Sequence, residues 1–319
     1  MNLEGLSVLV TGGSGSFGQK FTEMALPLGP RRLIIYSRDE LKQEEMRRRF
    51  GDADPLRYFI GDVRDEARLR RALEGVDIVV HAAALKQVPA AEYNPAEAVK
   101  TNIIGTLNLV EAALDCGVGK VLGLSSDKAV APLNLYGATK LVMEKLLIQA
   151  NSYRGPNRLT AFACTRYGNV IGSRGSVAPL FQEQARTGRV TVTHKDMTRF
   201  WLTLEQGVEF VLACLERMKG GEVFVPKVPS MRVVDVAWAL APDAEVEIIG
   251  IRPGEKLHEA MVAPGEQALD IGSCYVILPS HVTGWEGKGI MMPPMWSYTS
   301  DTNKQWLTNE AFKTLLEGA

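Results

Sequence analysis

Short apolar runs rich in β-branched residues alternate with longer amphipathic segments through the first half of the chain. The apolar runs are LSVLVTG (6–12), RRLIIYS (31–37), LRYFIGDV (56–63), VDIVVHAAA (76–84), KVLGLSS (120–126) and LTAFACTRY (159–167). Between them lie segments of helical periodicity such as DELKQEEMRRRF (39–50), EARLRRALEG (66–75) and PAEAVKTNIIGTLNLVEAALDCG (95–117). Apolar runs without polar alternation suit strands that are covered on both faces, and their alternation with helices predicts parallel pairing. We therefore predict an α/β fold with a Rossmann-type doubly wound parallel sheet.

The regular pattern ends near Tyr167. Beyond it, Gly and Pro cluster in GNVIGSRGSVAP, VPKVPSM, IRPGEK and MMPPMW, with shorter periodic segments between them. This pattern predicts a Rossmann domain over residues 1–167 and a smaller α/β substrate-binding lobe over 168–319. We expect some later segments, about residues 190–220, to pack back on the first domain.

Composition excludes several classes of protein. The 319 residues are 46% hydrophobic and 23% charged with a net charge of −1, which favours neither nucleic acid nor an anionic membrane surface as partner. The four cysteines show no CxxC spacing, which argues against a disulfide framework or a zinc site and fits a reducing compartment. The sequence shows no signal peptide and no apolar run of roughly 18 residues, so we expect a cytoplasmic protein without a metal.

The first candidate site is the segment VLVTGGSGSFG. The first predicted strand ends near Val10, and Gly13-x-Gly15-x-x-Gly18 opens the first predicted helix. Glycines allow a tight turn close to a pyrophosphate, whose charge is favoured by free N–H groups at a helix N-terminus. The segment therefore predicts a dinucleotide site that comprises Gly12, Ser14, Gly15, Ser16, Phe17 and Gly18.

The end of the second strand bears on which dinucleotide binds. An NAD site usually offers a carboxylate about 20 residues after the glycines, to bind the ribose 2′-hydroxyl. This chain has Ser37 and Arg38 there, with Lys42 one turn later. A hydroxyl and two cations suit a 2′-phosphate and favour NADP, although the cations also fit a solvated surface and Asp39 also fits a helix cap.

Other strand ends complete the predicted cofactor site. Asp62 and Val63 end the third strand, where the adenine is expected, and Ala82 and Ala83 end the fourth, where small residues allow close approach. To this site we also assign Lys86, Asn102, Ser125, Tyr136, Lys140 and Val170.

Tyr136 and Lys140 stand four residues apart in a segment of helical periodicity, so their side chains share one helix face. A tyrosine needs its pKa lowered from about 10 to act as a base near neutrality, and a neighbouring ammonium favours the phenolate. Downstream of a nucleotide-binding turn, this pair predicts a site for hydride transfer to or from a hydroxyl carbon. Asp127 and Lys128, just upstream, are a second ionisable pair that hydride transfer alone does not require.

Across nearly the whole chain the sequence resembles a known family, the extended short-chain dehydrogenase/reductases. Within them it resembles most closely the inverting UDP-N-acetylglucosamine 4,6-dehydratases of bacterial pseudaminic-acid and related surface-sugar pathways. The motifs that carry the resemblance are TGGSGSFG, SRDELKQ, FIGDVRD, HAAALKQVPAAEYNP, SSDKAV, NLYGATK, RYGNVIGSRGSV, MTRFWLTL, GGEVFVPKVPSM, GIRPGEKLHE and SDTNKQWL. The family usually has Thr-Asp-Lys where this chain has Ser126-Asp127-Lys128, and serine keeps the hydroxyl.

The resemblance implies roles for both ionisable pairs. Tyr136 takes the proton of the sugar 4-hydroxyl while the C4 hydride goes to NADP, and Lys140 supports it. Lys128 then acts as base at C5 and Asp127 as acid at the 6-hydroxyl, so that water is lost before the hydride returns to C6. Related retaining enzymes carry glutamate at the position of Lys128, so the lysine implies inversion at C5.

The resemblance also implies a substrate and an assembly. UDP-N-acetylglucosamine is the expected substrate, and the family forms homo-oligomers, including hexamers. Candidate substrate-binding residues are Lys86, Ser126, Asn169, Arg199, Arg252 and Glu255, with either arginine suited to the diphosphate or to a structural ion pair.

Three alternatives stay open. A UDP-N-acetylhexosamine 4-epimerase would use Tyr136 without needing Asp127 and Lys128. A dehydratase that retains configuration at C5, or that also epimerises elsewhere on the ring, is the second. A catalytically silent nucleotide sensor is the third, although intact Tyr136, Lys140, Asp127 and Lys128 speak against it.

Overall fold

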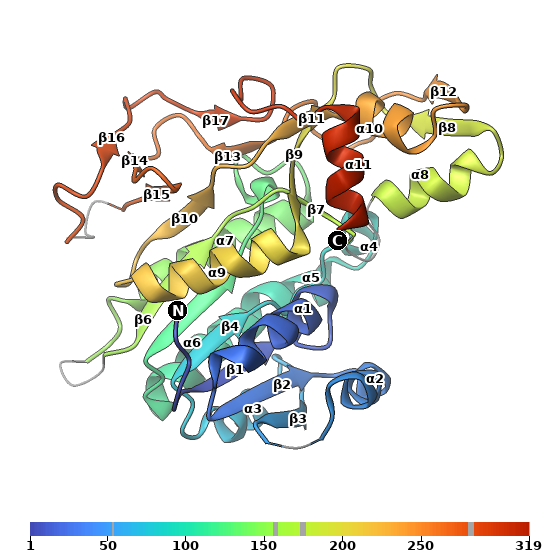
Figure 1. Cartoon of the computed structure of the whole chain (residues 1–319). Helices are drawn as coiled ribbons and strands as arrows, with labels where there is room; N and C mark the ends of the chain where they lie inside the picture. Colours follow the sequence, from blue (N-terminus) through green and yellow to red (C-terminus); the bar gives the residue numbers. More distant parts are fainter. Residues whose placement is uncertain (53, 156–158, 173–176, 280–283, 319) are drawn as a thin grey trace.

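The computed structural model describes residues 1–52, 54–155, 159–172, 177–279 and 284–318. Within these residues a ten-stranded sheet runs through the molecule, with helices on both faces (Figure 1). Its parallel part is, in spatial order, β3 (Leu56–Ile60), β2 (Arg32–Ser37), β1 (Ser7–Thr11), β4 (Ile78–His81), β5 (Lys120–Leu124), β6 (Ala161–Thr165) and β10 (Val223–Pro226). Three antiparallel strands extend it: β15 (Cys274–Ile277), β14 (Ala268–Asp270) and β16 (Ile290–Met291). The parallel sheet confirms the predicted fold class.

The strand order reverses between β1 and β4. Strand β1 pairs with β2 on one side and with β4 on the other, so successive crossovers lead away in opposite directions. In open parallel sheets such a switch point leaves a crevice outside the carboxyl ends of the strands. The glycine turn and the alanines that follow β4 both lie at this place.

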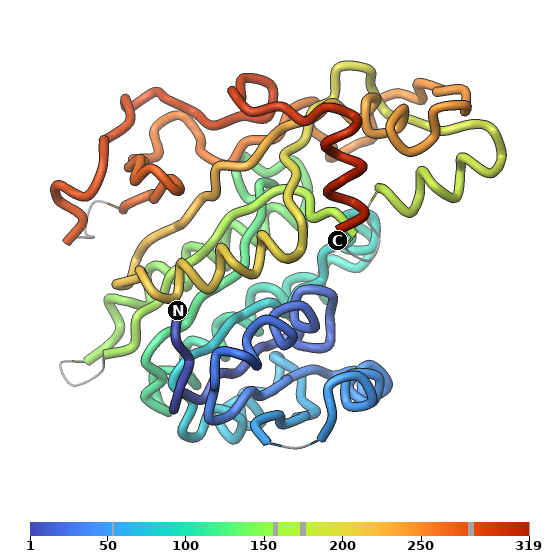
Figure 2. Tube along the Cα trace, in the orientation of Figure 1, coloured from blue at the N-terminus to red at the C-terminus, as the bar shows by residue number. Residues whose placement is uncertain are grey.

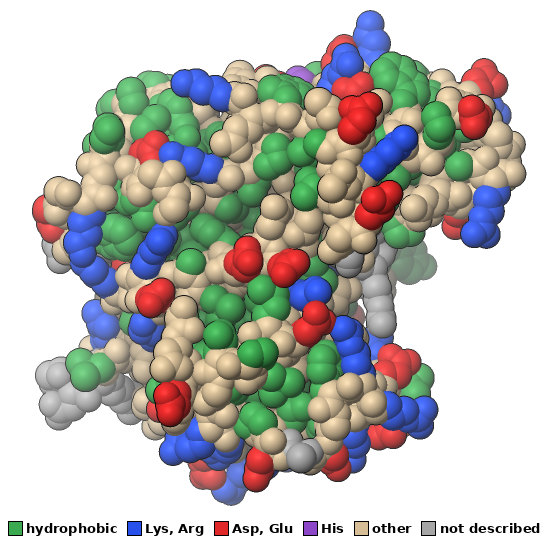
Figure 3. Space-filling model, viewed as in Figure 1, with side chains coloured by type: hydrophobic (Ala, Val, Ile, Leu, Met, Phe, Trp, Pro, Cys, Tyr) green, Lys and Arg blue, Asp and Glu red, His purple; other side chains and the backbone are tan. Residues whose placement is uncertain are grey.

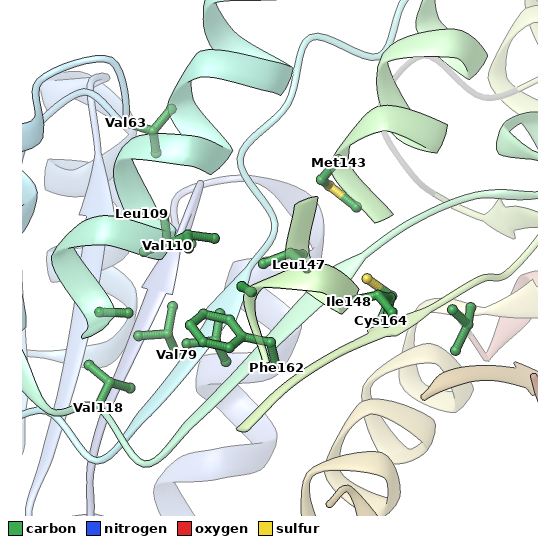
Figure 4. Packing of buried hydrophobic residues seen from close by; sticks show 14 of the residues in the cluster. Val63, Val79, Leu109, Val110, Val118, Met143, Leu147, Ile148, Phe162 and Cys164 are labelled. Atoms are coloured by element: carbon green, nitrogen blue, oxygen red, sulfur yellow. The ribbon is translucent and has the colours of Figure 1, made fainter. Parts of the chain in front are cut away.

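Helices α3 (Glu66–Leu73), α6 (Gly105–Cys116) and α7 (Leu135–Ala150) contribute to one core, and α1 (Ser16–Ala25) and α9 (Leu204–Arg217) contribute to the other. Figure 4 shows the first core, where Leu109 and Leu147 pack with Phe162. Val8 and Val10 of β1 belong to the second core, and Leu9 between them belongs to the first. Strand β1 is therefore apolar on both faces, as its uninterrupted apolar run predicts.

Polar side chains set where several helices begin. Asp39 caps α2 (Glu40–Phe50) by accepting a hydrogen bond from the Lys42 backbone N–H at 3.0 Å. Asn134 caps α7 in the same way, accepting from the Gly137 N–H at 2.8 Å. Because such caps satisfy N–H groups that lack intrahelical partners, they fix the first turn of each helix. The cap at Asn134 thus places the first turn of α7, where Tyr136 lies.

Several segments after β6 form a third core around Trp201, Met231 and Phe312. The remaining elements after β6, of which β13 and β17 pack in the first core, are β7 (Asn169–Ile171), α8 (Val177–Ala185), β8 (Arg189–Val192), β9 (Thr198–Thr203), β11 (Ser230–Arg232), α10 (Val233–Leu240), β12 (Glu245–Ile248), β13 (Ala260–Val262), β17 (Tyr298–Thr299) and α11 (Asn309–Glu317). Figure 2 shows the orange and red C-terminal segments along one side of the molecule. The division at residue 167 stays a prediction, and the main sheet draws strands from both sides of it.

Short elements fill the connections: η1 (Leu26–Leu28), α4 (Val88–Tyr93), α5 (Pro95–Val99), a π-helical turn η2 (Lys100–Ile104) and η3 (Asp127–Ala129). On the face drawn in Figure 3, basic and acidic side chains are interspersed. Among the described residues no helix has both the length and the apolarity needed to cross a membrane.

Candidate active site

A pocket of about 570 Å³ opens beyond the carboxyl ends of β1, β4, β5 and β6, at the switch point of the sheet. Its volume lies in the range of small-molecule and cofactor sites, roughly 300–1,000 Å³. The predicted site residues that line it are Gly12, Gly15, Ser16, Phe17, Lys42, Ala82, Ala83, Lys86, Ser125, Ser126, Lys128, Tyr136, Lys140, Asn169 and Val170. The fold thus brings together residues that stand far apart in the sequence.

Other predicted site residues are not part of the pocket wall. They are Ser14, Gly18, Ser37, Arg38, Asp39, Asp62, Val63, Asn102, Asp127, Arg199, Arg252 and Glu255. Several of them support the wall from behind. The hydroxyls of Ser14 and Ser37 lie 2.6 Å apart and join the glycine turn to β2. The Asn102 amide binds both backbone groups of Leu85 and donates to the Thr139 hydroxyl at 2.9 Å, which fixes the segment after β4.

The glycine turn leaves no room for side chains. Gly12 has a φ of +66°, and a Cβ there would lie 2.9 Å from the Ala83 backbone. A Cβ on Gly18 would lie 2.1 Å from the Gly13 carbonyl oxygen. No side chain of a described residue caps the N-terminus of α1 at Gly15, so backbone N–H groups there can receive an anion.

The predicted phosphate-binding cations at the end of β2 are already paired with carboxylates. Arg38 lies 3.4 Å from the Asp62 carboxylate, and Lys42 forms an ion pair with Asp39. Burial raises the pKa of Asp62, but its hydrogen bonds with Arg64 outweigh burial and hold the pKa below its usual value. Both cations remain about half exposed, with side-chain exposures of 51% for Arg38 and 40% for Lys42.

A buried histidine, His81, orders the backbone next to the pocket wall. The Thr106 hydroxyl donates to the Asn102 carbonyl at 2.7 Å, so it accepts from His81 Nε2–H, 3.1 Å away. His81 Nδ1 then accepts from the Thr11 hydroxyl at 2.7 Å, and Thr11 accepts from the Ala83 N–H at 3.2 Å. Burial lowers the pKa of His81 to about 3, so the ring is neutral. It therefore orders the backbone at Ala83 rather than transferring protons.

Tyr136 and Lys140 lie on the first two turns of α7 and line the pocket. Burial raises the pKa of Tyr136, and the charge of Lys128 and a hydrogen bond with the Ser126 side chain oppose this rise. Lys140 Nζ donates to the Leu124 carbonyl at 2.7 Å. Burial lowers the pKa of Lys140 to about 8, so this amine carries its charge only in part near that pH.

Asp127 and Lys128 form the short helix η3 directly after β5. Lys128 Nζ donates to Asp127 Oδ1 at 3.1 Å, and Ser126 Oγ donates to the same oxygen at 2.8 Å. Asp127 is 1% exposed, and among the described residues its Oδ2 has no hydrogen-bond partner. Burial raises the pKa of this carboxyl group and outweighs the charge of Lys128.

A second carboxylate contacts Lys128, and sequence reasoning missed it. Glu259 Oε1 lies 3.3 Å from Lys128 Nζ, and its side chain is 3% exposed. Burial alone would lower the pKa of Lys128, but Asp127 and Glu259 outweigh it and hold the pKa above its usual value. Arg199 Nε lies 4.0 Å from Glu259 Oε1, and its Nη1 and Nη2 donate to the carbonyls of Leu257 and Lys256. Arg199, a predicted substrate residue, thus belongs to this buried cluster.

The last two predicted substrate residues lie in the segment before β13. The charged groups of Arg252 and Glu255 are 3.9 Å apart, and the Arg252 side chain is 56% exposed. Residues of the pocket wall that sequence reasoning did not single out are Gln87, Leu124, Tyr167, Gly168 and Leu204. The motifs HAAALKQ and RYGNV contain three of these and could have indicated them. Residues 173–176 of the motif RYGNVIGSRGSV lie outside the described residues.

Within the part of the chain that the structure describes, no group of three His, Cys, Asp or Glu side chains is arranged to hold a metal ion. Candidate acid–base groups are Tyr136 and Lys140 of α7 and the Lys128–Asp127 pair, of which all but Asp127 line the pocket. A tyrosine and a lysine on one helix face suit proton transfer at a hydroxyl. A lysine paired with a buried carboxyl group suits removal of one proton and delivery of another.

The chain is similar in sequence to a protein family and to named proteins. A model of the polysaccharide biosynthesis protein family matches residues 8–277. An inverting UDP-N-acetylglucosamine 4,6-dehydratase of Campylobacter jejuni is 49% identical over 321 residues, covering 96% of this chain and 96% of the relative. A UDP-glucose 4-epimerase of Rickettsia conorii is 43% identical over 271 residues, covering 82% of this chain and 79% of the relative.

Among solved structures, the X-ray structure of Pen from Bacillus thuringiensis has a TM-score of 0.92 and 36% sequence identity, covering 100% of this chain and 99% of that chain. This likeness extends over the parallel sheet and the C-terminal segments alike. The chain therefore belongs to the polysaccharide biosynthesis protein family, and its likeness to the inverting dehydratase over nearly its whole length confirms the resemblance that its motifs predicted.

Proposed function

We propose that the chain is a UDP-N-acetylglucosamine 4,6-dehydratase that inverts C5 and forms UDP-2-acetamido-2,6-dideoxy-β-L-arabino-hex-4-ulose. The observation that carries the proposal is the position of Lys128, which lines the same pocket as Tyr136 and Lys140 while its amine contacts Asp127 at 3.1 Å. An oxidoreductase or an epimerase requires only the tyrosine and its lysine. The 49% identity to an enzyme of this name supports the same conclusion.

The pocket fits a nicotinamide dinucleotide, and we propose NADP. The uncapped N-terminus of α1 and the close approach at Gly12 would accommodate the pyrophosphate. Ser37, Arg38 and Lys42 would receive the 2′-phosphate, which would compete with Asp62 and Asp39 for the two cations. When bound, the nicotinamide would accept the C4 hydride and later return it to C6, so that oxidation and reduction cancel.

The first proton transfer belongs to Tyr136. Its phenolic oxygen takes the proton of the sugar 4-hydroxyl as the C4 hydride departs, and C4 becomes a ketone. Burial opposes a phenolate, and the charge of Lys128 favours it. Lys140 lies one turn further along α7 and, when charged, adds to this stabilisation.

The elimination needs an amine and a carboxylic acid, whereas Lys128 at rest is an ammonium beside a carboxylate. A single proton transfer from Lys128 Nζ to Asp127 Oδ1, across 3.1 Å, forms both groups together. The Lys128 amine then removes the C5 proton, which the 4-ketone has acidified. The Asp127 carboxyl group protonates the departing 6-hydroxyl, so water leaves and the original ion pair is restored. When the hydride returns to C6, C5 would take up a proton on the opposite face, which inverts that carbon, and Tyr136 would release the proton that it had taken.

Further parts of the assignment are proposals of the same kind. Residues 1–167 would bind the cofactor and 168–319 the UDP-sugar, with Asn169 and Lys86 on the pocket wall and Arg252 and Glu255 not part of that wall. We also propose a cytoplasmic homo-oligomer, of up to six subunits, that acts in pseudaminic-acid or related surface-sugar synthesis, as its motifs imply.

The test is proton NMR of the purified protein with NADP and UDP-N-acetylglucosamine in deuterated water. The expected result is a new 6-methyl signal, deuterium at C5 and ring couplings of the L-arabino configuration. Asp127→Asn should abolish the methyl signal while C4 oxidation persists as a rise in reduced-nicotinamide absorbance. A methyl product with unchanged C5 would contradict the role given to Lys128.

The second candidate is a UDP-sugar 4-epimerase. The observation in its favour is the 43% identity to a UDP-glucose 4-epimerase over most of the chain. In the same NMR experiment an epimerase would give a hexose that differs only at C4, without a methyl signal. No change with any UDP-sugar would instead favour a nucleotide sensor.

A further inference from the structure

Glu259 is a buried carboxylate that touches the catalytic pair without lining the pocket. It stands at the end of the motif GIRPGEKLHE, directly before β13. Its Oε1 lies 3.3 Å from Lys128 Nζ. Asp127 Oδ1 lies 3.1 Å from the same Nζ. Lys128 is 26% exposed and Glu259 3% exposed, so the lysine faces the pocket and Glu259 lies behind it.

The segment that carries Glu259 is fixed against the loop that carries Lys128. Asn134 Nδ2 donates to the Gly254 carbonyl at 2.9 Å, and Lys256 Nζ donates to the Val130 carbonyl. The Glu259 backbone N–H donates to Ser300 Oγ at 2.9 Å. These contacts place a carboxylate of the C-terminal half behind an amine that follows β5.

Several charged side chains surround the Glu259 carboxylate. Lys128, Lys256 and Arg199 lie 3.3, 3.5 and 4.0 Å from its carboxylate, and Asp127 contacts Lys128 from the other side. Without Glu259, three cations would face one carboxylate in a largely buried space. Like charges at such distances disfavour one another, so Lys128 would lose its proton more readily.

We propose that Glu259 is a positioning residue for the dehydration, because its carboxylate anchors the Lys128 amine at the pocket wall and retains the proton on it until elimination begins. This inference rests on the proposed function. A cationic Lys128 stabilises the Tyr136 phenolate during C4 oxidation, and a Lys128 that loses its proton too early no longer does so. Glu259 therefore keeps Lys128 cationic during C4 oxidation, so that the amine acts as a base only when elimination begins.

The charged and titratable groups that act on Lys128 come from four elements: Asp127 of η3, Tyr136 of α7, Arg199 of β9, and Glu259 before β13. Burial alone would lower the pKa of Lys128, and the two carboxylates outweigh it. Arg199 acts in the opposite direction to Glu259. Substituting Glu259 by glutamine thus leaves only Asp127 to offset burial and Arg199, and it moves the lysine pKa downwards.

The experiment measures the titration of Lys128 directly. Trace acetylation with isotopic acetic anhydride reports the neutral amine, and mass spectrometry of the peptide that contains Lys128 gives its pH midpoint. Glu259→Gln should lower the midpoint by at least about one pH unit, which means about tenfold more labelling at a fixed pH below it. Glu259→Asp, which keeps the charge, should restore most of the shift. Glu266→Gln, which removes a carboxylate of another buried ion pair, should leave it unchanged.

An unchanged midpoint in Glu259→Gln, or an equal shift in Glu266→Gln, would overturn the proposal. A second readout uses catalysis: the limb of kcat that falls as pH rises should move to lower pH in Glu259→Gln, with little change in KM. The labelling result does not depend on the reaction. If the midpoint shifts but the protein makes no methyl product, the result supports the anchoring by Glu259 and rejects dehydration. If dehydration is normal but the midpoint does not shift, the result supports dehydration and rejects the anchoring.

Discussion

Arg166 offers the sharpest test of how the two halves of the chain are held together. It follows β6, is 2% exposed, and donates to both Glu144 oxygens at 2.9 and 2.7 Å. It also donates to both Glu266 oxygens at 2.8 Å and to the Met261 carbonyl at 3.0 Å. One guanidinium thus joins the sheet, the catalytic helix α7 and the segment after β13. We consider the substitution Arg166→Met, which keeps much of the volume and removes every donor.

The expected cost follows from what Arg166→Met leaves behind. Glu144 is 2% exposed and would become a buried carboxylate without a partner, whereas Glu266 is 24% exposed and can regain water. Removing one partner of a buried ion pair costs about 3–5 kcal/mol. The hydrogen bonds are not additive, so their sum does not apply. We expect a loss of about 3–5 kcal/mol in the free energy of unfolding, dominated by Glu144.

The assay is urea unfolding followed by circular dichroism, for Arg166→Met and for the double variant Glu144→Leu/Arg166→Met. Because the double variant leaves no buried charge at Glu144, it should be more stable than Arg166→Met alone, although it differs at one more position. Equal or lower stability of the double variant would refute the reasoning that the stranded carboxylate dominates. A loss below about 1 kcal/mol in Arg166→Met would show that the ion pairs contribute as little as surface pairs do.

Three further outcomes are expected. Gly18→Ala should weaken dinucleotide binding more than tenfold by calorimetry, since its Cβ would lie 2.1 Å from a backbone oxygen, while Gly155→Ala, in open space, should not. Burial lowers the pKa of Lys140 to about 8 in the folded protein, whereas it is about 10.5 in the unfolded chain. Between these pH values the unfolded chain holds more protons than the folded protein, so the free energy of unfolding rises with pH. Lys140→Met should flatten this rise in urea unfolding. Thr203→Ala removes the capping box of α9 and should cost about 1 kcal/mol in the same assay.

Local patterns account for the parts of the site that the sequence predicted. The glycine turn follows a strand whose uninterrupted apolar run requires two covered faces, and the turn must approach the segment after β4 closely. Tyr136 and Lys140 share a helix face because their spacing is that of one helical turn. In both cases the chemistry lies within one element and its flanks, which a single sequence can show.

Pairing between distant charges was beyond such reasoning. Arg38 was predicted to await a phosphate, and the structure pairs it with Asp62 from the neighbouring strand end. Arg199 was predicted to bind the diphosphate or to form a structural ion pair. In the structure it lies 4.0 Å from Glu259, with its guanidinium on backbone carbonyls. In each case the residue type was compatible with both roles, and only the register of neighbouring strands decided which partner came within reach.

Glu259 is the residue near Lys128 that the sequence did not predict. Its motif was recognised, yet nothing in the motif says that a glutamate 131 positions after Lys128 would lie 3.3 Å from its amine. A base that must first be a cation needs a counter-ion that does not itself react. In the proposed reaction Asp127 cannot fill that role, because it would receive the proton that Lys128 gives up. The proposed mechanism divides these roles between two carboxylates. Asp127 would take part in the reaction, and Glu259 would stay charged, because Lys128, Arg199 and Lys256 outweigh its burial and hold its pKa below the usual value.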